Sequence, residues 1–259
     1  MPPPVVKVEG HFGEWLQGRL GPDGPVVLVT VRCPPLSVEA PGEGTPPFTP
    51  AQLDRFAGHL GLGALPGARR NFPMGAGAGG STATLVAMAR AGGFGGPPDT
   101  LAAACLAIEG ASDPLMFERP DRLLWASREG RILRDIAPPP RCEILGGFWG
   151  EPRRTDPTDM DFDDITDLTD DWAQATEAAD LPRAAAIATE SARRCTARRG
   201  PADPTADLAG ALGALGWLRA HTGSARGLIF APSALPATGA DALSEAGLTQ
   251  VLTFRTGSI

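Results

Sequence analysis

The segment PMGAGAGGSTATLVAMAR, residues 73–90, constrains the fold more than any other part of the chain. Four glycines, at positions 75, 77, 79 and 80, stand directly before two hydroxyl residues and a small, apolar, helix-forming run. Glycine lets the backbone adopt positive φ and lets other groups approach it closely. The unpaired amides at the start of a helix, together with the helix dipole, attract anions. The segment therefore predicts a phosphate-binding loop that leads into a helix ending near Arg90.

Two other interpretations of this segment are open from the residues alone. Gly75 to Gly80 satisfies GxGxxG, but that dinucleotide fingerprint follows a buried strand and has an acidic residue about 20 positions later. Here the preceding PGARRNFPM is polar and broken by proline, and only Asp99 lies near the required position. The segment also fits a flexible loop that caps the next helix. The phosphate loop is favoured because Ser81 and Thr82 then supply hydroxyl groups that can contact phosphate or Mg²⁺.

Composition narrows the classes of function. The chain has 259 residues, of which 42% are hydrophobic and 20% charged, as in ordinary globular proteins with a large core. A net charge of −7 argues against a nucleic-acid partner. Lys7 is the sole lysine, so a Gly-Lys-Ser/Thr phosphate loop is excluded and Schiff-base chemistry has no other lysine. The four cysteines form no CxxC pair and predict neither a zinc site nor disulfides.

The sequence predicts no membrane contact and a cytoplasmic location. No apolar run approaches the roughly 20 residues that a membrane-spanning helix needs. The N-terminal MPPPVVKVEG lacks the basic and apolar regions of a signal peptide.

Strand and helix patterns are mixed without regular alternation, which favours an α+β fold. Strands are expected at residues 4–9, 25–32, 123–127, 131–136, 142–150, 227–230 and 251–254, with the turn-rich GPDGP after the first of them. Helices are expected at residues 51–62, 80–90, 100–109, 170–179, 181–198, 204–220 and 238–246. The proline run at 138–140 predicts a division into domains at residues 1–138 and 139–259.

Three segments in order resemble the GHMP superfamily of small-molecule kinases. The glycine segment, from Pro73 onward, resembles the superfamily's phosphate loop, P-x-x-x-G-(L/M)-(G/A)-S-S-(A/T). HFGEWLQGRLG at 11–21 resembles its N-terminal G-E-x-x-x-x-G segment, and AHTGSARGLIF at 220–230 resembles its C-terminal glycine loop. The residues of these segments, together with IEGASDPLMF at 108–117 and IATESARR at 187–194, are most similar to the L-threonine kinase branch. That branch is associated with propanediol utilisation and cobalamin synthesis. The resemblance spans almost the whole chain.

The resemblance implies a two-domain fold, with an N-terminal half like ribosomal protein S5 domain 2 and an α/β C-terminal half. It implies a kinase that uses ATP and Mg²⁺ to phosphorylate a small amino-acid-like alcohol, L-threonine first, and it leaves a homodimer open. The implied ATP contacts are Pro73, Gly75, Gly77, Gly79, Gly80, Ser81 and Thr82. The implied Mg²⁺ ligands are Ser81 and Glu109. The implied acceptor contacts are Glu14, Gln17, His221, Thr222, Gly223 and Ser224.

Some of these residues also have plainer interpretations. Glu109 by itself fits a solvated carboxylate at a helix end, and the turn around Gly223 fits a purely geometric role. His11 has two interpretations, an acceptor contact and a structural residue, and the structural one is favoured because a lone histidine at the end of a strand is usually structural. The eight aspartates of residues 155–171 are interpreted as a solvated, helix-capping stretch, and ARRCTARRG at 192–200 as an ordinary basic surface at a helix end.

The chain also departs from the superfamily's pattern at two positions. Gly80 replaces the first serine of the usual pair, and Thr84 stands where threonine-kinase-like sequences carry an aspartate. Asp113 is therefore a candidate to take over part of that catalytic role. The departures motivate a second hypothesis, a nucleotide-binding regulatory or scaffold protein that has the fold without the phosphoryl transfer.

Overall fold

A single sheet runs through the computed structural model, which describes residues 4–257. The strand order is β5-β4-β2-β1-β7-β8-β6-β9, with β3 paired to β2. The strands are β1 Val6–Arg19, β2 Val26–Ala40, β3 Arg69–Arg70, β4 Leu123–Ala126, β5 Arg131–Asp135, β6 Cys142–Phe148, β7 Gly216–Arg219, β8 Ala225–Phe230 and β9 Thr249–Thr256. All pairings between these strands are antiparallel. The described residues therefore lack the parallel βαβ unit that a dinucleotide fold requires.

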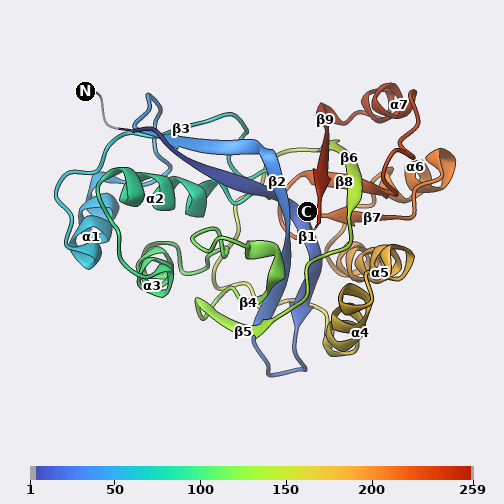
Figure 1. Ribbon diagram of the computed structural model, residues 1–259, viewed down its shortest axis with the longest axis horizontal. Helices are drawn as coiled ribbons and strands as arrows, with labels where there is room; N and C mark the ends of the chain where they lie inside the picture. Colours follow the sequence, from blue (N-terminus) through green and yellow to red (C-terminus); the bar gives the residue numbers. More distant parts are fainter. Residues whose placement is uncertain (1–3, 258–259) are drawn as a thin grey trace.

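The first two strands form a long ribbon that crosses the molecule (Figure 1). Both are longer than their apolar patterns predict, because glycines after Glu9 in β1 and two prolines in β2 interrupt the pattern without ending the pairing. Gly13 adopts a φ of 67°, and the register shifts on both sides of it while β1 continues against β2. The expected turn at GPDGP is confirmed, with Leu20 N donating to Pro25 O at 3.1 Å.

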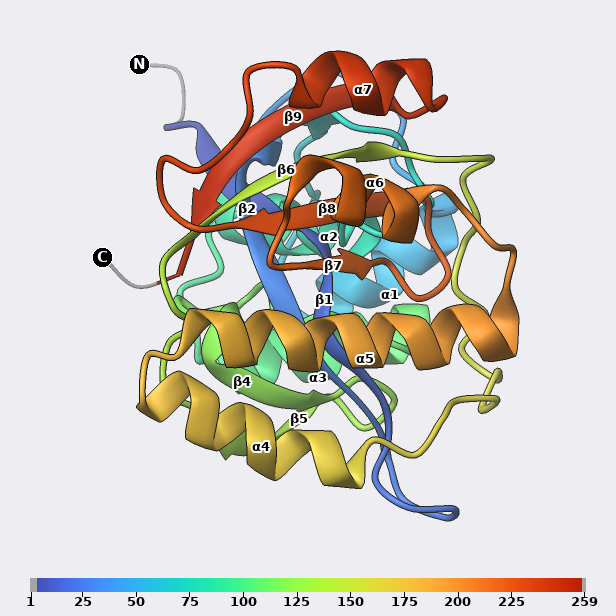
Figure 2. The same ribbon diagram turned by 90° about the vertical axis from the view of Figure 1, so that its right-hand side faces the viewer.

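Helices lie on both sides of this ribbon (Figures 1 and 2). The first group is α1 Pro50–Leu60, α2 Gly80–Ala91 and α3 Pro98–Glu109, and α2 packs on β1 and β2. The second group is α4 Thr166–Glu177, α5 Leu181–Arg199, α6 Thr205–Leu212 and α7 Gly239–Glu245, and α5 packs on β1 and β7. Within residues 4–257, every helix is too short or too polar to cross a bilayer.

The strands segregate by position in the chain, which confirms the α+β class. The four strands β1, β2, β4 and β5 occupy one end of the sheet order, and β6 to β9 occupy the other. The two sets meet where Glu14 of β1 pairs with Arg219 of β7. The predicted boundary at 138/139 falls between β5 and β6, and a division into two domains there stays a prediction.

The helix expected over residues 204–220 is wrong in its second half. α6 ends at Leu212, and Gly213 caps it in the left-handed conformation with a φ of 68°. The residues Gly216–Arg219 instead form β7, which is buried along its whole length and pairs with β8. Apolar residues on both sides of the glycine resemble a continued helix, but the sheet supplies a backbone partner that the helix pattern cannot reveal.

Aromatic side chains pack across the junction between the two sets of strands. Phe12 of β1 is fully buried, and its ring centroid lies 5.6 Å from those of Phe148 in β6 and Phe254 in β9. Trp15, on the same strand, packs 5.5 Å from Trp172 of α4. Strand β1 is thereby fixed to three elements of the C-terminal half.

We expect Phe12→Ala to lower the free energy of unfolding by about 3–5 kcal/mol, the usual cost of a large-to-small change in a closely packed core. Urea denaturation measures the change. Leu215→Ala is the control, because that side chain is 39% exposed and its truncation should cost less than about 1 kcal/mol. Equal losses for the two variants would show that Phe12 does not hold the halves together.

Candidate active site

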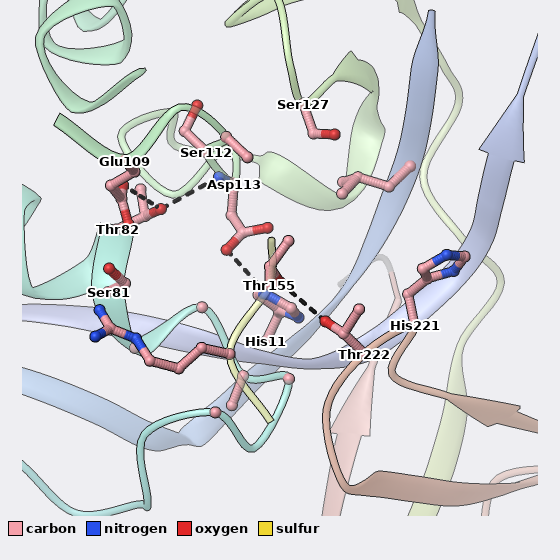
Figure 3. A pocket seen from close by; sticks show the side chains of 18 of the residues that line it. His11, Ser81, Thr82, Glu109, Ser112, Asp113, Ser127, Thr155, His221 and Thr222 are labelled. Atoms are coloured by element: carbon pink, nitrogen blue, oxygen red, sulfur yellow. Dashed lines mark hydrogen bonds and ion pairs between the residues drawn. The ribbon is translucent and has the colours of Figure 1, made fainter. Parts of the chain in front are cut away.

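A cavity of about 290 Å³ lies at the junction of the two sets of strands. Its wall includes Glu14 of β1, where the two sets pair, and the glycine segment from residues 74 to 82 except Ala76. The end of α3, the turn after β4, the segment after β6 and the turn before β8 also contribute to the lining. Figure 3 shows side chains from these separate segments pointing toward one space.

The glycine segment is folded by alternating backbone conformations. Gly75, Gly77 and Gly79 have φ values of 76°, 74° and 67°, in the left-handed region that favours glycine. Ala76 and Ala78, between them, are buried. Glycine at every second position is therefore a conformational requirement of this loop.

The carbonyl groups of the glycine segment have backbone hydrogen-bond partners, whereas its amides from Gly77 to Thr82 have none in the described chain. The carbonyl oxygens of residues 75–78 accept hydrogen bonds of 2.8–3.3 Å from the backbone amides of Arg153, Ala225, Gly13 and His11, in that order. Within residues 4–257, the amides of Gly77 to Thr82 donate no hydrogen bond to another group. These amides stand at the start of α2, whose N-cap is Gly79. The arrangement suits an anion, because free amides and the positive end of the helix dipole coincide.

Close packing also requires glycine at two of these positions. A Cβ added at Gly77 would lie 2.1 Å from the Cβ of Ala220. One added at Gly79 would lie 2.6 Å from Leu115 Cδ1 and 2.7 Å from His11 Cδ2. The loop is thus held against β1 and the C-terminal half by contacts that no larger residue permits.

Glu109 lies beside this loop. It is the last residue of α3, and Gly110 ends the helix in the left-handed conformation. Thr82 Oγ1 donates to Glu109 Oε2 at 2.9 Å and accepts from the amide of Asp113 at 3.3 Å (Figure 3). Burial raises the pKa of Glu109 to about 8, although hydrogen bonds from the hydroxyls of Ser81 and Thr82 oppose the rise. A carboxylate in this position is favoured only if a cation accompanies it.

A second group of ionisable side chains, His11, Glu14 and Asp113, lines the same cavity. His11 Nε2 is 3.4 Å from Asp113 Oδ2, and His11 Nδ1 is 3.2 Å from the carbonyl oxygen of Gly13. Burial by itself lowers the pKa of His11, but the carboxylates of Asp113 and Glu14 outweigh it and raise that pKa to about 9. Burial raises the pKa of Glu14 to about 7, partly opposed by His11. His11 therefore lies in the cavity wall beside Asp113, and its role, structural or in acceptor binding, stays a prediction.

The structure brings most of the predicted site residues to the cavity. The lining includes Glu14, Gln17, Gly75, Gly77, Gly79, Gly80, Ser81, Thr82, Glu109, Asp113, His221 and Thr222. Pro73, Gly223 and Ser224 do not line it. Gly223 instead packs on the loop, because a Cβ there would lie 2.1 Å from the amide nitrogen of Gly77. Thr84 also lies away from the cavity, with its hydroxyl donating to Gly80 O at 2.6 Å inside α2.

The segment after β6 contributes residues that the sequence does not single out. Arg153, Arg154 and Thr155 line the cavity, and Thr155 Oγ1 lies 2.9 Å from Thr222 Oγ1. Farther along, Phe162 stacks on His221 with ring centroids 3.9 Å apart. Arg128, from the turn after β4, also lines the cavity. No local sequence pattern predicts that these residues belong to the site, because contacts with residues distant in the chain bring them there.

The aspartates of residues 155–171 are mostly exposed, as expected, but several of them have ion-pair partners. They form ion pairs with the arginines at the end of α5, between Asp159 and Arg199, Asp161 and Arg198, Asp163 and Arg198, and Asp167 and Arg194. The acidic and basic stretches, far apart in the sequence, are therefore one ion-paired surface. Asp164 does cap the start of α4 through Thr166, as expected. Within the described part of the chain, no group of three or more His, Cys, Asp or Glu side chains is suited to a metal ion.

The chain matches no protein-family model and no curated protein. Solved structures do resemble it. Mevalonate kinase from methicillin-resistant Staphylococcus aureus is 16% identical, with a TM-score of 0.60 over 98% of this chain and 99% of that one. Streptococcus pneumoniae phosphomevalonate kinase is 12% identical, with a TM-score of 0.63 over 97% and 99%.

A putative homoserine kinase from Listeria monocytogenes is 14% identical, with a TM-score of 0.62 over 98% of this chain and 96% of that one. In each case the likeness extends over nearly the full length of both chains. The antiparallel sheet and helices of this chain have the fold of the GHMP kinases.

Proposed function

We propose that this protein is an ATP-dependent kinase that phosphorylates the hydroxyl group of a small metabolite. The observation that carries the proposal is the row of amides from Gly77 to Thr82, which has no acceptor within the described chain and stands at the mouth of α2. Phosphoryl transfer depends mainly on positioning and on neutralising charge. Free amides at a helix N-terminus, beside a cavity, supply the first requirement for a triphosphate.

Ser81 and Glu109 fit the Mg²⁺ that such a kinase uses. Mg²⁺ takes one or two protein oxygens, together with phosphate oxygens and waters. Burial makes the charged form of Glu109 costly, as its raised pKa shows, and a divalent cation would remove that cost. When bound, Mg²⁺ neutralises part of the phosphate charge.

Asp113 is the candidate to act on the acceptor. Its carboxylate is partly exposed in the cavity and is held by His11, which is itself buried. In this proposal Asp113 takes the proton of the acceptor hydroxyl while that oxygen bonds to the γ-phosphorus and the bond to ADP breaks. The acceptor contacts Glu14, Gln17, His221 and Thr222 stay in the proposal, and L-threonine stays the leading acceptor on the sequence resemblance. Gly223 and Ser224 are assigned to support of the turn.

A specific observation favours a second candidate, a nucleotide-binding regulatory protein. Thr84 replaces an aspartate of threonine-kinase-like sequences, and its hydroxyl bonds to Gly80 O inside α2. If Asp113 does not substitute for that aspartate, the chain binds ATP without transferring phosphate.

The direct test is ADP release from ATP and Mg²⁺ in the presence of L-threonine, L-serine, L-homoserine and 1,2-propanediol. We expect turnover with at least one amino-acid alcohol and the highest kcat/KM with L-threonine. Thermal stabilisation by a non-hydrolysable ATP analogue, without ADP release from any acceptor, favours the regulatory candidate. Absence of both results contradicts the kinase proposal.

Glu109→Gln is expected to abolish transfer while stabilising the folded protein at pH 8. Because the pKa of Glu109 is raised to about 8, folding retains a proton that the unfolded chain loses near pH 4.5. The wild-type protein therefore loses stability as pH rises from about 4.5 to 8, by an amount on the order of a few kcal/mol from this group. Glutamine has no proton to lose, so the variant escapes this loss.

Urea denaturation at pH 5 and pH 8, together with kcat, measures both effects of this change. Glu118→Gln is the matched control, because Glu118 is an exposed glutamate outside the cavity. The control should keep both the wild-type kcat and the wild-type pH dependence. A Glu109→Gln protein with the same pH dependence as the wild type, or with unchanged kcat, would contradict the assignment.

The His11–Asp113 pair predicts a fall in kcat at high pH. His11 keeps its positive charge below about pH 9, so the pair is broken as pH rises through that value. Asp113→Asn should lower kcat roughly 100-fold. His11→Gln should lower it less and remove the alkaline fall. His59→Gln, at an exposed histidine of α1, should leave the pH–rate profile unchanged, and an alkaline fall that persists in His11→Gln would refute the pairing.

A further inference from the structure

A second cavity, of about 400 Å³, lies next to the first. The two share Arg153, His221 and Thr222, and the turn at residues 221–223 stands between them. The glycine segment lines only the first cavity. The guanidinium-bearing residues of the second lining are Arg153, Arg199, Arg219 and Arg226.

Two of these arginines form an unfavourable pair. Arg219 of β7 and Arg226 of β8 are direct register partners in antiparallel strands, so their side chains leave the sheet on the same face. Only 4% of Arg219 and 2% of Arg226 is exposed. Like charges directly opposite one another destabilise a sheet, and burial removes the water that would screen them.

The chain itself neutralises only one of the two. Arg226 Nε lies 2.5 Å from Asp203 Oδ2, and both side chains are 3% exposed. Arg219 has no carboxylate within ion-pair distance among residues 4–257. Its register partner on β1 is Glu14, but burial raises the pKa of that carboxyl to about 7, so Glu14 balances Arg219 only in part at neutral pH. Its partners are uncharged: Thr196 Oγ1 at 2.7 Å, Gly200 O at 3.2 Å and Ala220 O at 3.2 Å. Of its five N–H donors, three are used in this way.

The other carboxylates of the lining do not compensate for Arg219. Asp159 pairs with Arg199, and Asp161 pairs with Arg198. Glu151, also in the lining, is exposed. A buried guanidinium without a counter-ion is costly unless a ligand supplies one.

We propose that the second cavity is an anion site, in which Arg219 and Arg226 bind an oxyanion, the carboxylate or phosphate group of a small metabolite. Guanidinium groups match both kinds of oxyanion through paired N–H donors. The site is separate from the phosphate loop but adjoins it, because Gly223 of the dividing turn packs on Gly77. The oxyanion belongs either to a free anion or to the tail of an acceptor whose hydroxyl end reaches the first cavity.

Inorganic phosphate is the probe, titrated by calorimetry at constant ionic strength and pH, with and without a saturating non-hydrolysable ATP analogue. The analogue fills the phosphate loop, so the binding that persists reports on the second cavity. We expect Arg219→Gln to weaken this binding at least roughly tenfold, as loss of a charge-assisted hydrogen bond does. Arg219→Lys keeps the positive charge but lacks the paired N–H donors of a guanidinium group, so it should bind phosphate with intermediate affinity.

Arg255→Gln is the matched control, because its side chain is 82% exposed and lies outside the cavity. It should bind phosphate as the wild type does. Absence of phosphate binding to the wild type in the presence of the analogue overturns the proposal, as does equal binding by wild type and Arg219→Gln. Circular dichroism and urea denaturation verify that Arg219→Gln and Arg255→Gln keep the wild-type fold.

Acceptor kinetics separate the two sources of the anion. In phosphate-free buffer, a raised acceptor KM in Arg219→Gln assigns the oxyanion to the acceptor, whereas an unchanged KM assigns it to a free anion. These kinetics rest on the proposed kinase activity, but the calorimetry does not. A chain that fails to bind the ATP analogue, yet binds phosphate in an Arg219-dependent manner, contradicts the kinase and keeps the anion site.

Discussion

The site depends on one backbone arrangement, the alternation of conformation from Gly75 to Gly79. Positive φ at every second residue directs carbonyl oxygens toward β1, β8 and Arg153, and leaves the amides of Gly77 to Thr82 without acceptors. The same carbonyl contacts join strands from both ends of the sheet order. The loop is therefore both the candidate phosphate site and part of the connection between the halves, and a side chain at Gly77 or Gly79 would disturb both roles.

The charged groups of the site gather at that connection. Glu14 and Arg219 are the residues through which β1 pairs with β7, and His11 and Asp113 lie on the N-terminal side of the same junction. Burial there strengthens electrostatic interactions, since little water screens them. Burial raises the pKa values of Glu14 and Glu109, and the carboxylate of Asp113 adds to both rises. The pKa of His11 rises for another reason, because Asp113 and Glu14 outweigh the lowering effect of burial.

The local sequence predicts the conformation of the glycine loop but does not predict the contacts that surround it. The glycine segment was predictable because positive φ and a helix start leave a signature within a few residues. The pairing of His11 with Asp113 could not be predicted, because the two residues are more than a hundred positions apart in the chain. The aspartates after residue 155 and the arginines of α5 were each interpreted alone, although they neutralise one another. The helix predicted through Gly216 failed for the same reason, since β8 is the partner that makes that segment a strand.

Two ionisable groups, Glu109 and Arg219, have no ion-pair partner in the described chain, and each lines a cavity. Glu109 adjoins free amides, where a triphosphate and a cation would balance it. Arg219 adjoins Arg226, where an oxyanion would balance it. A fold selected only for stability would not retain either group unpaired, because removal of a buried, uncompensated charge is commonly stabilising. Ligands that complete both sites would offset the free-energy cost of these groups. The two groups therefore mark positions where ligand binding would stabilise the folded protein.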